Sequence, residues 1–483
     1  MYDHTRQYRC TIIRGKSQSD MDNLLPLYAQ IIDSICPCDE ADFKVAFDDA
    51  IRPALKAKER TNNEPTQKTF DNHRTENAKQ LFGMYYTADD GKVYASERTM
   101  KFIEDGDTPA FFKDICYKMQ FPNGSQKYQT VSARINNEIN IRQFPFLLKV
   151  MLLAKNSNNT TLSKKEIGYY VLNSLDVLQG KANPLEVCDA ILSDRKNHIE
   201  HDIRTPGKKS SYDWQHINEQ INLLEHANLV IIDGYKVSVN PNEMDTIQIF
   251  AERYSDKPEF DVYSYDLSTV NKRNQFYFDW HEYFSKLSDR AGEFETTADA
   301  LGAPTMPALA PLVDTVEAET ETQSTVEIGD EGERYVYEYE KQRVTAFNFR
   351  LAGKVIHLSK TRGLGYDIQS VVAQEGETAE FVKYIEVKAT KRVTAPNIDD
   401  NSWIDTLNIT RNEWVASQQH KDSYSIFRVY FVRGSVIMFV LTNIAQKCDD
   451  GLLKAVPTTY RIDFGSNAVD EVISPSGGAT SNV

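Results

Sequence analysis

Two short, strand-like stretches carry the residues of this chain whose types and spacing could do chemistry. GYDIQS contains Asp367, and YIEVKAT contains Glu386 and Lys388. A turn centred on Gly376–Glu377 would join the stretches into a hairpin, with glycine first as a type II′ turn prefers. In that register Asp367 lies directly opposite Glu386, and a longer loop with the same centre keeps the pairing.

Two carboxylates opposite each other repel and destabilise a sheet. A divalent cation between them removes the repulsion, and hard carboxylate oxygens suit Mg²⁺. Because side chains alternate along a strand, Lys388 shares the face of Glu386, while Ile385 and Val387 face the core. Lys388 could orient a water molecule or stabilise charge on a phosphate. The pattern predicts metal-assisted hydrolysis of a phosphodiester.

Basic residues occur close to these acids in the sequence. We expect them to form a phosphate-binding track in an otherwise acidic chain of net charge −15, although each alone is typical of solvated surface. The track residues are Arg362, Lys391 and Arg411, with Lys360 and Arg392 beside them. The alternative for the acids is an exposed hairpin face with an ordinary salt bridge, which is worth little.

The two stretches resemble the PD-(D/E)xK nuclease signature, in the form found in NO VEIN-type nuclease-like domains. The resemblance extends to IGDEGERYVYEYEKQRV upstream and to LNITRNEWVAS and YSIFRVYFV downstream, and covers most of 326–440. It implies an α/β restriction-endonuclease-like domain with a mixed central sheet. The proline of the named signature is absent, because Tyr366 precedes the aspartate.

The same resemblance implies roles for individual residues. Asp367 and Glu386 would be Mg²⁺ ligands, the Val387 carbonyl would complete the ligand set, and Lys388 would serve the water. Glu333 would be the catalytic acid on the first helix, although its spacing from Asp330 also fits a capping box. Glu338 and Glu340 are expected on the solvated face of that helix.

The N-terminal part contains a faint internal repeat. RTENAKQLF precedes two β-like runs joined through Asp90–Gly91, and HINEQINLLEHANL precedes two runs joined through Asp233–Gly234. Asp-Gly is a strong hairpin signal, and helix plus hairpin is the second half of a winged helix, although both are also common parts of other folds. The candidate base-reading residues are Arg74, Asn77, Lys79 and Gln80 in the first copy and Gln215, Asn218 and Asn222 in the second.

Length and composition divide the chain. A chain of 483 residues with 41% hydrophobic content is expected to form two or three domains. We expect a mainly helical module with winged-helix-like regions at 1–150 and 151–286, and a nuclease domain at 326–467. A flexible acidic linker rich in alanine, proline and threonine is expected at 287–325, and a disordered tail at 468–483.

The N-terminal module resembles the recognition regions of type IIS restriction endonucleases, on KVYASERTMKFIEDG, MQFPNG and INIRQFPFLLKVMLLA. This resemblance implies specific binding of double-stranded DNA and cleavage at a distance. It also implies a cognate methyltransferase encoded separately. A double-strand break would further require sequential nicking or a transient homodimer through the nuclease domain.

The function predicted is therefore a Mg²⁺-dependent type II, type IIS-like restriction endonuclease. The six cysteines form no CxxC pair, the N-terminus has no signal-peptide core, and no apolar run is long enough to span a membrane, so we expect a cytoplasmic protein. No GxxxxGK[ST] motif suggests ATP-driven translocation. Two alternatives are a defence or RNA-processing nuclease without fixed sequence specificity and a catalytically degenerate DNA-binding protein.

Overall fold

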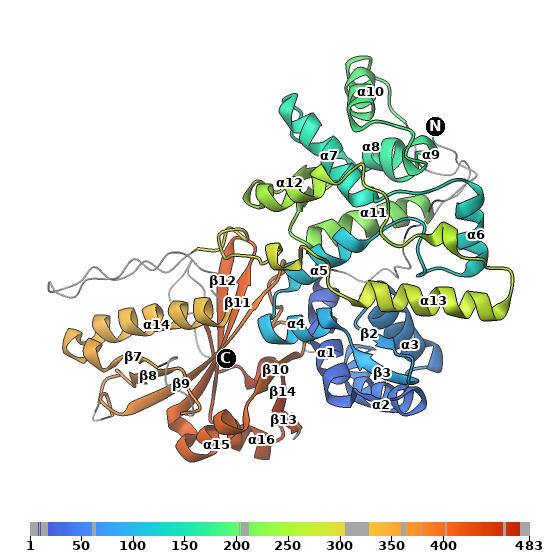
Figure 1. The fold of residues 1–483 in the computed structure, drawn as a ribbon. Coiled ribbons are helices and arrows are strands. Elements are labelled where there is room, and N and C mark those ends of the chain that lie inside the picture. Colours follow the sequence, from blue (N-terminus) through green and yellow to red (C-terminus); the bar gives the residue numbers. More distant parts are fainter. Residues whose placement is uncertain are drawn as a thin grey trace.

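The chain folds into a large helical module followed by an α/β domain (Figure 1). This computed structural model describes residues 8, 10, 18–59, 64–201, 203, 212–304, 328–358, 364–376, 378–400, 403–456 and 460–473. Within these ranges, no helix is both long and apolar enough to cross a membrane.

The first unit of the helical module packs helices against a three-stranded antiparallel sheet. Its elements are α1 (Gln18–Ile35), β1 (Cys38–Asp39), α2 (Glu40–Glu59), α3 (Gln67–Asp71), the π-helical segment η1 (Asn72–Leu81), β2 (Tyr85–Thr87) and β3 (Lys92–Ala95). The third strand lies between the other two. The hairpin predicted at Asp90–Gly91 is present, with Gly91 in the left-handed conformation that such a turn requires.

A second unit repeats this order of elements. It contains β4 (Leu162–Ser163), α8 (Lys164–Glu166), η2 (Ile167–Leu172), α9 (Leu175–Leu178), α10 (Pro184–Lys196), α11 (Tyr212–His226), β5 (Val230–Asp233) and β6 (Lys236–Val239). Its third strand is again central, and the hairpin predicted at Asp233–Gly234 is present. The internal repeat expected from the sequence therefore exists as a shared strand order.

The remaining helices of the module connect and cover the two units. They are α4 (Glu97–Asp105), α5 (Thr108–Lys118), α6 (Tyr128–Asn136), α7 (Gln143–Asn156), α12 (Met244–Glu252) and α13 (Val270–Ser285), with short 3-10 turns η3 (Pro241–Glu243), η4 (Val262–Ser264) and η5 (Ala291–Glu293). One continuous hydrophobic core runs through both units, so the module is a single packed body.

The C-terminal domain is built on a six-stranded mixed sheet of order β15-β12-β11-β9-β8-β7. Its elements are α14 (Ile328–Phe347), η6 (Phe349–Lys354), β7 (Ile356–His357), β8 (Ile368–Val371), β9 (Val382–Lys391), β10 (Asp405–Ile409), α15 (Arg411–His420), η7 (Lys421–Ser423), β11 (Tyr424–Val432), β12 (Ser435–Thr442), α16 (Ile444–Asp449), β13 (Leu453–Val456), β14 (Tyr460–Phe464), η8 (Ser466–Ala468) and β15 (Glu471–Ile473). β9 pairs in parallel with β11 and antiparallel with β8.

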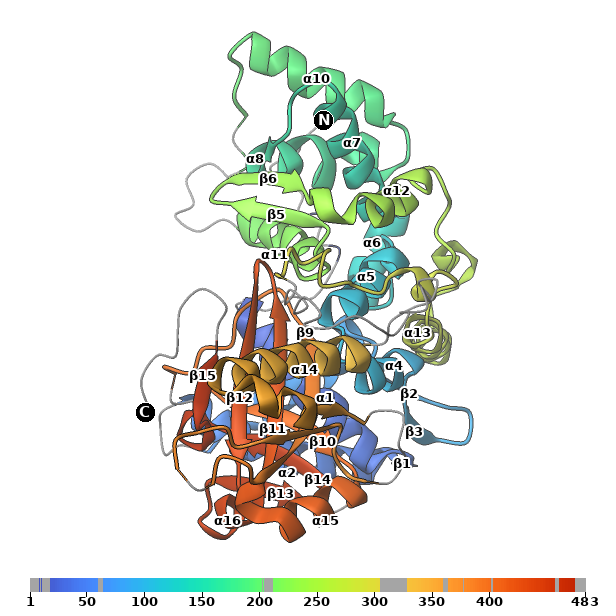
Figure 2. The ribbon, with the colours of Figure 1, turned by 90° about the vertical axis from the view of Figure 1, so that its left-hand side faces the viewer.

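Both faces of this sheet are buried. α14 crosses one face (Figure 2), where Phe427 and Val429 of β11 join its core. Ile426 and Tyr430, which alternate with them, belong to a second core with α15 and α16. β11 is buried along its whole length, as expected for a central strand covered on both sides.

The hairpin of β8 and β9 has the predicted register. Ile368 pairs with Ile385, and Val371 pairs with Val382. The loop is longer than a two-residue turn, but its centre is the one expected, so the pairing is preserved. The pairing ends at Ile368, and the Asp367 N–H then donates to the Ile385 carbonyl, so Asp367 lies just past the paired residues, beside the segment that carries Glu386.

Glu340 corrects the expectation of a solvated helix face. Its side chain is fully buried, accepts a 2.6 Å hydrogen bond from the Ser370 hydroxyl and forms an ion pair with Arg343 at 2.7 Å. Arg343 also donates to the carbonyls of Val371 and Val372. This face of α14 is polar because it is fastened to β8 by charged hydrogen bonds, rather than because it contacts water.

Residues 287–304 are packed, in contrast to the flexible linker expected there. Phe294 belongs to the core of the helical module, whereas Ala298 and Leu301 belong to the core of the C-terminal domain. The apolar residues that enter the two cores are few and show no regular spacing, so composition alone predicts a linker. Residues 305–325 of the expected linker fall in the part of the chain that the structure does not describe.

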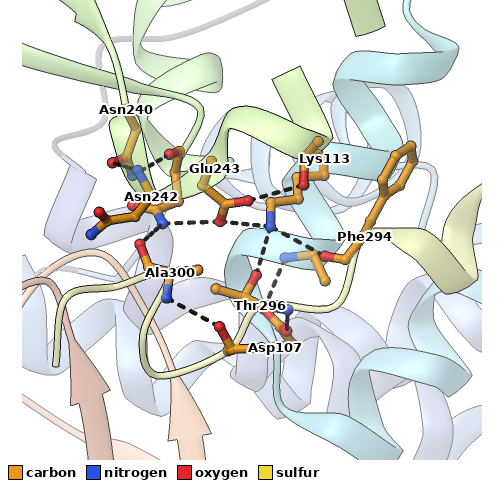
Figure 3. A network of polar contacts seen from close by, with 12 residues as sticks. Asp107, Lys113, Asn240, Asn242, Glu243, Phe294, Thr296 and Ala300 are labelled. Carbon is orange, nitrogen blue, oxygen red and sulfur yellow. Dashed lines mark hydrogen bonds and ion pairs between the residues drawn. The ribbon is translucent and has the colours of Figure 1, made fainter. Parts of the chain in front are cut away.

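Buried polar groups fix this segment to the helical module (Figure 3). Lys113 is fully buried and donates to Glu243 at 2.8 Å, to the Thr296 hydroxyl at 3.0 Å and to the Phe294 carbonyl at 3.3 Å. The Thr296 N–H donates to Asp107 at 2.7 Å. These partners lie far apart in the sequence, so no local pattern could predict them.

The C-terminal domain also extends beyond the boundary expected at residue 467. Ala468 and Val469 are buried, and β15 pairs with β12 through Met438–Ile473 and Val440–Glu471. A three-residue edge strand leaves almost no hydrophobic pattern, so the sequence suggested a disordered tail. Residues 474–483 lie outside the described ranges.

Candidate active site

Asp367 and Glu386 meet where β8 begins beside β9. Asp367 receives a 2.8 Å hydrogen bond from the Val387 N–H to its Oδ2 atom, and its own N–H donates to the Ile385 carbonyl at 2.9 Å. Glu386 is 3% exposed, so the acids are not part of an open, charged hairpin face. Ile385 and Val387 point into the core, as the alternation predicts.

Lys388 lies on the same face and contacts two carboxylates. Its Nζ atom is 2.7 Å from Glu386 Oε1 and 3.0 Å from Glu413 Oε2. About a quarter of its side chain is exposed, so the ammonium group is held between acids at the edge of the cleft.

Glu333 reaches this centre from α14. Its Oε2 atom lies 2.9 Å from His357 Nε2 on β7. The helix can approach because residue 332 is glycine, and a Cβ atom there would lie only 2.5 Å from the Ala389 Cβ atom of β9. Gly332 thus allows the first turn of α14 to place Glu333 beside the two acids.

Burial and mutual repulsion set the electrostatics of the acids. Burial raises the pKa of the Asp367 carboxyl to about 6, and the charge of Glu333 adds to the rise. Burial also raises the pKa of Glu386 well above its usual range, with Asp367 and Glu413 adding and Lys388 opposing. Burial alone would lower the pKa of Lys388, but the carboxylates of Glu386 and Glu413 raise it. The site is a concentration of negative charge that favours a cation.

The donor set fits a magnesium ion. Within the described residues, no three His, Cys, Asp or Glu side chains already surround a common point as a metal site. Mg²⁺, however, commonly uses only one or two carboxylates and keeps several water ligands. The carboxylates of Asp367 and Glu386 are hard oxygen donors that lie close enough to repel each other, and Lys388 offsets part of their charge.

The acids line a cleft of about 450 Å³ between the C-terminal domain and the helical module. Pro26, Ala29 and Gln30 of α1 form part of its wall, together with residues 102–106 at the end of α4. The Gly106 carbonyl accepts hydrogen bonds from the Thr390 hydroxyl at 2.8 Å and the Lys391 N–H at 3.1 Å. The helical module therefore covers one side of the site.

The expected basic track is only partly placed at the cleft. Lys391 is buried, forms an ion pair with Glu331 at 2.8 Å and lies at the contact between the two parts of the chain. Arg392 is also buried, and donates to Asn23 at 3.0 Å. Arg411 is exposed at the first turn of α15, beside the cleft residue Thr410. Lys360 and Arg362 lie outside the described residues.

The candidate base-reading residues of the first unit are held within the protein. Arg74 is 7% exposed and forms ion pairs with Asp48 and Asp71, and Asn77 is buried and donates to the Tyr28 hydroxyl at 3.3 Å. Lys79 and Gln80 are half-buried on the same segment, η1. In this state, Arg74 and Asn77 are not accessible to DNA bases.

The candidates of the second unit are more accessible. Gln215 is exposed on α11 and donates to Glu219 at 2.8 Å, and Asn218 and Asn222 are half-buried on the following turns. The three residues are spaced by three and four positions, so they lie along one side of the helix.

Glu413 was not among the residues selected from the sequence. Thr410 and Glu413 form a capping box at the start of α15, in which each side chain accepts a hydrogen bond from the backbone N–H of the other. This pattern is visible in LNITRNEW, but it predicts only where a helix begins. The contact of Glu413 with Lys388 depends on the packing of α15 against the sheet.

The fold and the site define a restriction-endonuclease-like protein with two functional parts. Residues 2–281 match the family described as "Restriction endonuclease BpuJI - N terminal", which covers more than half of the chain. The chain belongs to this family. Residues 332–441 match the family "Protein NO VEIN, C-terminal", which includes Glu333, Asp367, Glu386 and Lys388.

One solved structure supports the first match. The chain is 51% identical to the protein in "Crystal structure of pyrene- and phenanthrene-modified DNA in complex with the BpuJ1 endonuclease binding domain". The similarity covers 59% of this chain and all of that chain, with a TM-score of 0.54. No curated protein matches the chain.

Proposed function

We propose that this protein is a Mg²⁺-dependent, sequence-specific DNA endonuclease of type II with a type IIS-like arrangement. The observation that carries the proposal is the meeting of Asp367, Glu386 and Lys388 at one partly buried cleft of a domain joined to a BpuJI-type N-terminal module. The relative with 51% identity is a DNA-binding domain in complex with DNA, which supports double-stranded DNA as the partner. The helical module would bind the recognised sequence, and its two repeated units would act as winged helices.

The chemistry follows from the positions of the side chains. Asp367, Glu386 and the Val387 carbonyl would hold Mg²⁺, which supplies Lewis-acid stabilisation of the phosphate and a more acidic water. The Val387 N–H fixes one oxygen of Asp367 and leaves the other for binding. Lys388 would direct its ammonium group to the attacking water or to a phosphate oxygen.

The nuclease resemblance further implies in-line attack by water, with a 5′-phosphate and a 3′-hydroxyl as products. Glu333 would supply a further acid from α14, and its contact with His357 fixes its position. A single centre cuts one strand. A double-strand break would then use a transient homodimer or two successive nicks, and the host would be protected by a separately encoded methyltransferase in the same cytoplasm.

The test uses the purified chain and its Lys388→Ala variant with phage DNA and Mg²⁺, followed by sequencing of the fragment ends. Ends at a fixed offset from one motif, absent with the variant, would support the proposal. Ragged ends would replace site-specific cleavage with a nuclease of no fixed specificity. No cleavage of DNA or RNA, with no binding of Mg²⁺, would make the chain a degenerate binding protein.

A further inference from the structure

Lys388 has two carboxylate partners that come from different elements. Glu386 is two residues away on β9, whereas Glu413 lies on α15, on the same face of the sheet. Only 4% of the Glu386 side chain and 12% of the Glu413 side chain are exposed. Burying an acid costs free energy that a partner must offset, and here two largely buried acids share one lysine as their partner.

The position of Glu413 is fixed independently of Lys388. Its Oε2 atom accepts a 2.8 Å hydrogen bond from the Thr410 N–H, and the same atom lies 3.0 Å from Lys388 Nζ. The capping box and the positive end of the helix dipole both favour a carboxylate at this place. Glu413 is therefore a rigid acceptor aimed at the Lys388 ammonium group.

Glu386 cannot fix Lys388 alone during the proposed reaction. Its carboxylate is also assigned to the metal, so the oxygen that now contacts Lys388 has a competing partner. Glu413 is not assigned to the metal, so its carboxylate can stay paired with Lys388 throughout the proposed reaction.

We propose that Glu413 is a positioning residue that holds the Lys388 ammonium group at the scissile phosphate. This inference rests on the proposed nuclease function and assigns Glu413 a role in it. Glu413 acts through Lys388 and does not touch the reacting atoms. Displacing a reacting group by about 1 Å can cost about 100-fold in rate, so the expected effect is on turnover rather than on DNA binding.

A purely structural role for Glu413 would be the capping of α15, and two variants separate the roles. Glu413→Gln keeps the capping interaction, because glutamine also serves at this position of a capping box, but it removes the negative charge from Lys388. Thr410→Ala is the matched control, because it removes the hydroxyl that caps the helix but keeps the backbone N–H that holds the Glu413 carboxylate, and with it the charge of Glu413. Loss of an N-cap typically costs about 1 kcal/mol of stability.

The experiment measures kcat and KM for DNA cleavage at saturating Mg²⁺ for wild type, Glu413→Gln, Thr410→Ala and Lys388→Ala. The expected result for Glu413→Gln is a kcat lower by about 10- to 100-fold, with KM within about threefold of wild type. Thr410→Ala should lower the melting temperature and keep kcat within about threefold. Full turnover in Glu413→Gln, or an equal loss of kcat in Thr410→Ala, would overturn the inference.

A second readout needs neither metal nor cleavage. In ¹⁵N-lysine-labelled protein, an ammonium group held between two acids exchanges slowly enough to give a signal, and Lys388→Ala identifies it. The signal should persist in Thr410→Ala and broaden or vanish in Glu413→Gln. An unchanged signal in Glu413→Gln would show that Glu386 suffices. If wild type does not cut DNA, the proposed function fails, while this spectrum still decides whether Glu413 holds Lys388.

Discussion

The guanidinium group of Arg433 donates to the Asn228 side-chain oxygen at 2.9 Å, and so joins the β11–β12 turn to the end of α11. Arg433 also donates to the Val230 carbonyl at 3.1 Å, and the neighbouring Gly434 N–H donates to the Leu301 carbonyl at 2.9 Å. The C-terminal domain is thus bound to the segment that follows α11, the helix that carries the candidate base-reading residues of the second unit. Elsewhere along the boundary between the two parts, α1 and the end of α4 line the cleft of the acids.

Arg433→Ala should loosen this contact and expose the active site. Charged hydrogen bonds are worth about 1.5–3 kcal/mol, so we expect cleavage of DNA that lacks the recognised sequence to rise about tenfold or more. Small-angle scattering of the variant should also show a larger radius of gyration. Arg350→Ala is the control, because Arg350 is exposed. Unchanged scattering and unchanged non-specific cleavage in Arg433→Ala would contradict the prediction.

Asp367→Asn should stabilise the metal-free protein at neutral pH. An acid whose folded pKa is raised from 3.8 to about 6 holds its proton more tightly in the folded state. The stabilisation that this bound proton contributes is therefore fully present below the unfolded pKa, and it is lost as the pH rises through about 6. The asparagine variant should gain on the order of 2 kcal/mol at pH 8 and little at pH 4.

Urea denaturation at the two pH values measures this difference. Asp399→Asn provides the control in the same domain, because Asp399 is exposed. If Asp367→Asn is less stable than wild type at pH 8, the carboxylate is not strained in the way its burial implies.

Divalent metal should raise the melting temperature of the wild type through the same acids. A ligand that binds only the folded state at about 100 times its Kd stabilises by about 2.7 kcal/mol. Mg²⁺ or Ca²⁺ should give a shift of a few degrees, whereas Asp367→Asn and Glu386→Gln should give little or none. KCl at equal ionic strength controls for screening. An equal shift in wild type and both variants would place the metal elsewhere.

The sequence predicted the part of the site that depends on local order. Asp367 and Glu386 are brought together by a hairpin, and its register follows from the centre of one loop and from alternation along the strands. The repeated units were visible for the same reason, because Asp90–Gly91 and Asp233–Gly234 mark hairpins directly.

The sequence could not predict contacts that depend on packing. Glu413 and Lys388 meet because α15 lies against the sheet, and Glu340 is buried because Arg343 and Ser370 surround it. For Arg74 the error is the opposite one. The sequence predicts that this helical arginine contacts DNA, whereas the structure pairs it with Asp48 inside the protein. In each case the sequence shows a charged residue on a helix, and only the tertiary structure shows which partner it contacts.

Glu340→Ala should destabilise the C-terminal domain strongly. Its removal leaves Arg343 without a carboxylate beside the buried Ser370 hydroxyl, and breaking a buried ion pair costs about 3–5 kcal/mol. Glu380→Ala is the matched control, because its pair with Lys354 is exposed and worth at most about 1 kcal/mol. Thermal unfolding should separate the two variants clearly. Equal melting temperatures would show that the Glu340 cluster contributes no net stability.

Asn218→Ala should weaken sequence preference without unfolding the protein. Asn218 is half-buried on α11, and an asparagine that reads adenine contributes about 1–3 kcal/mol of discrimination. Fluorescence anisotropy should show Kd for the recognised duplex rising about 10- to 100-fold, with Kd for a scrambled duplex unchanged. Arg74→Ala should instead lower the melting temperature, because it removes the ion-pair partner of the buried Asp48. If Asn218→Ala weakens both duplexes equally, α11 contacts the DNA backbone, and the bases are read by another part of the module.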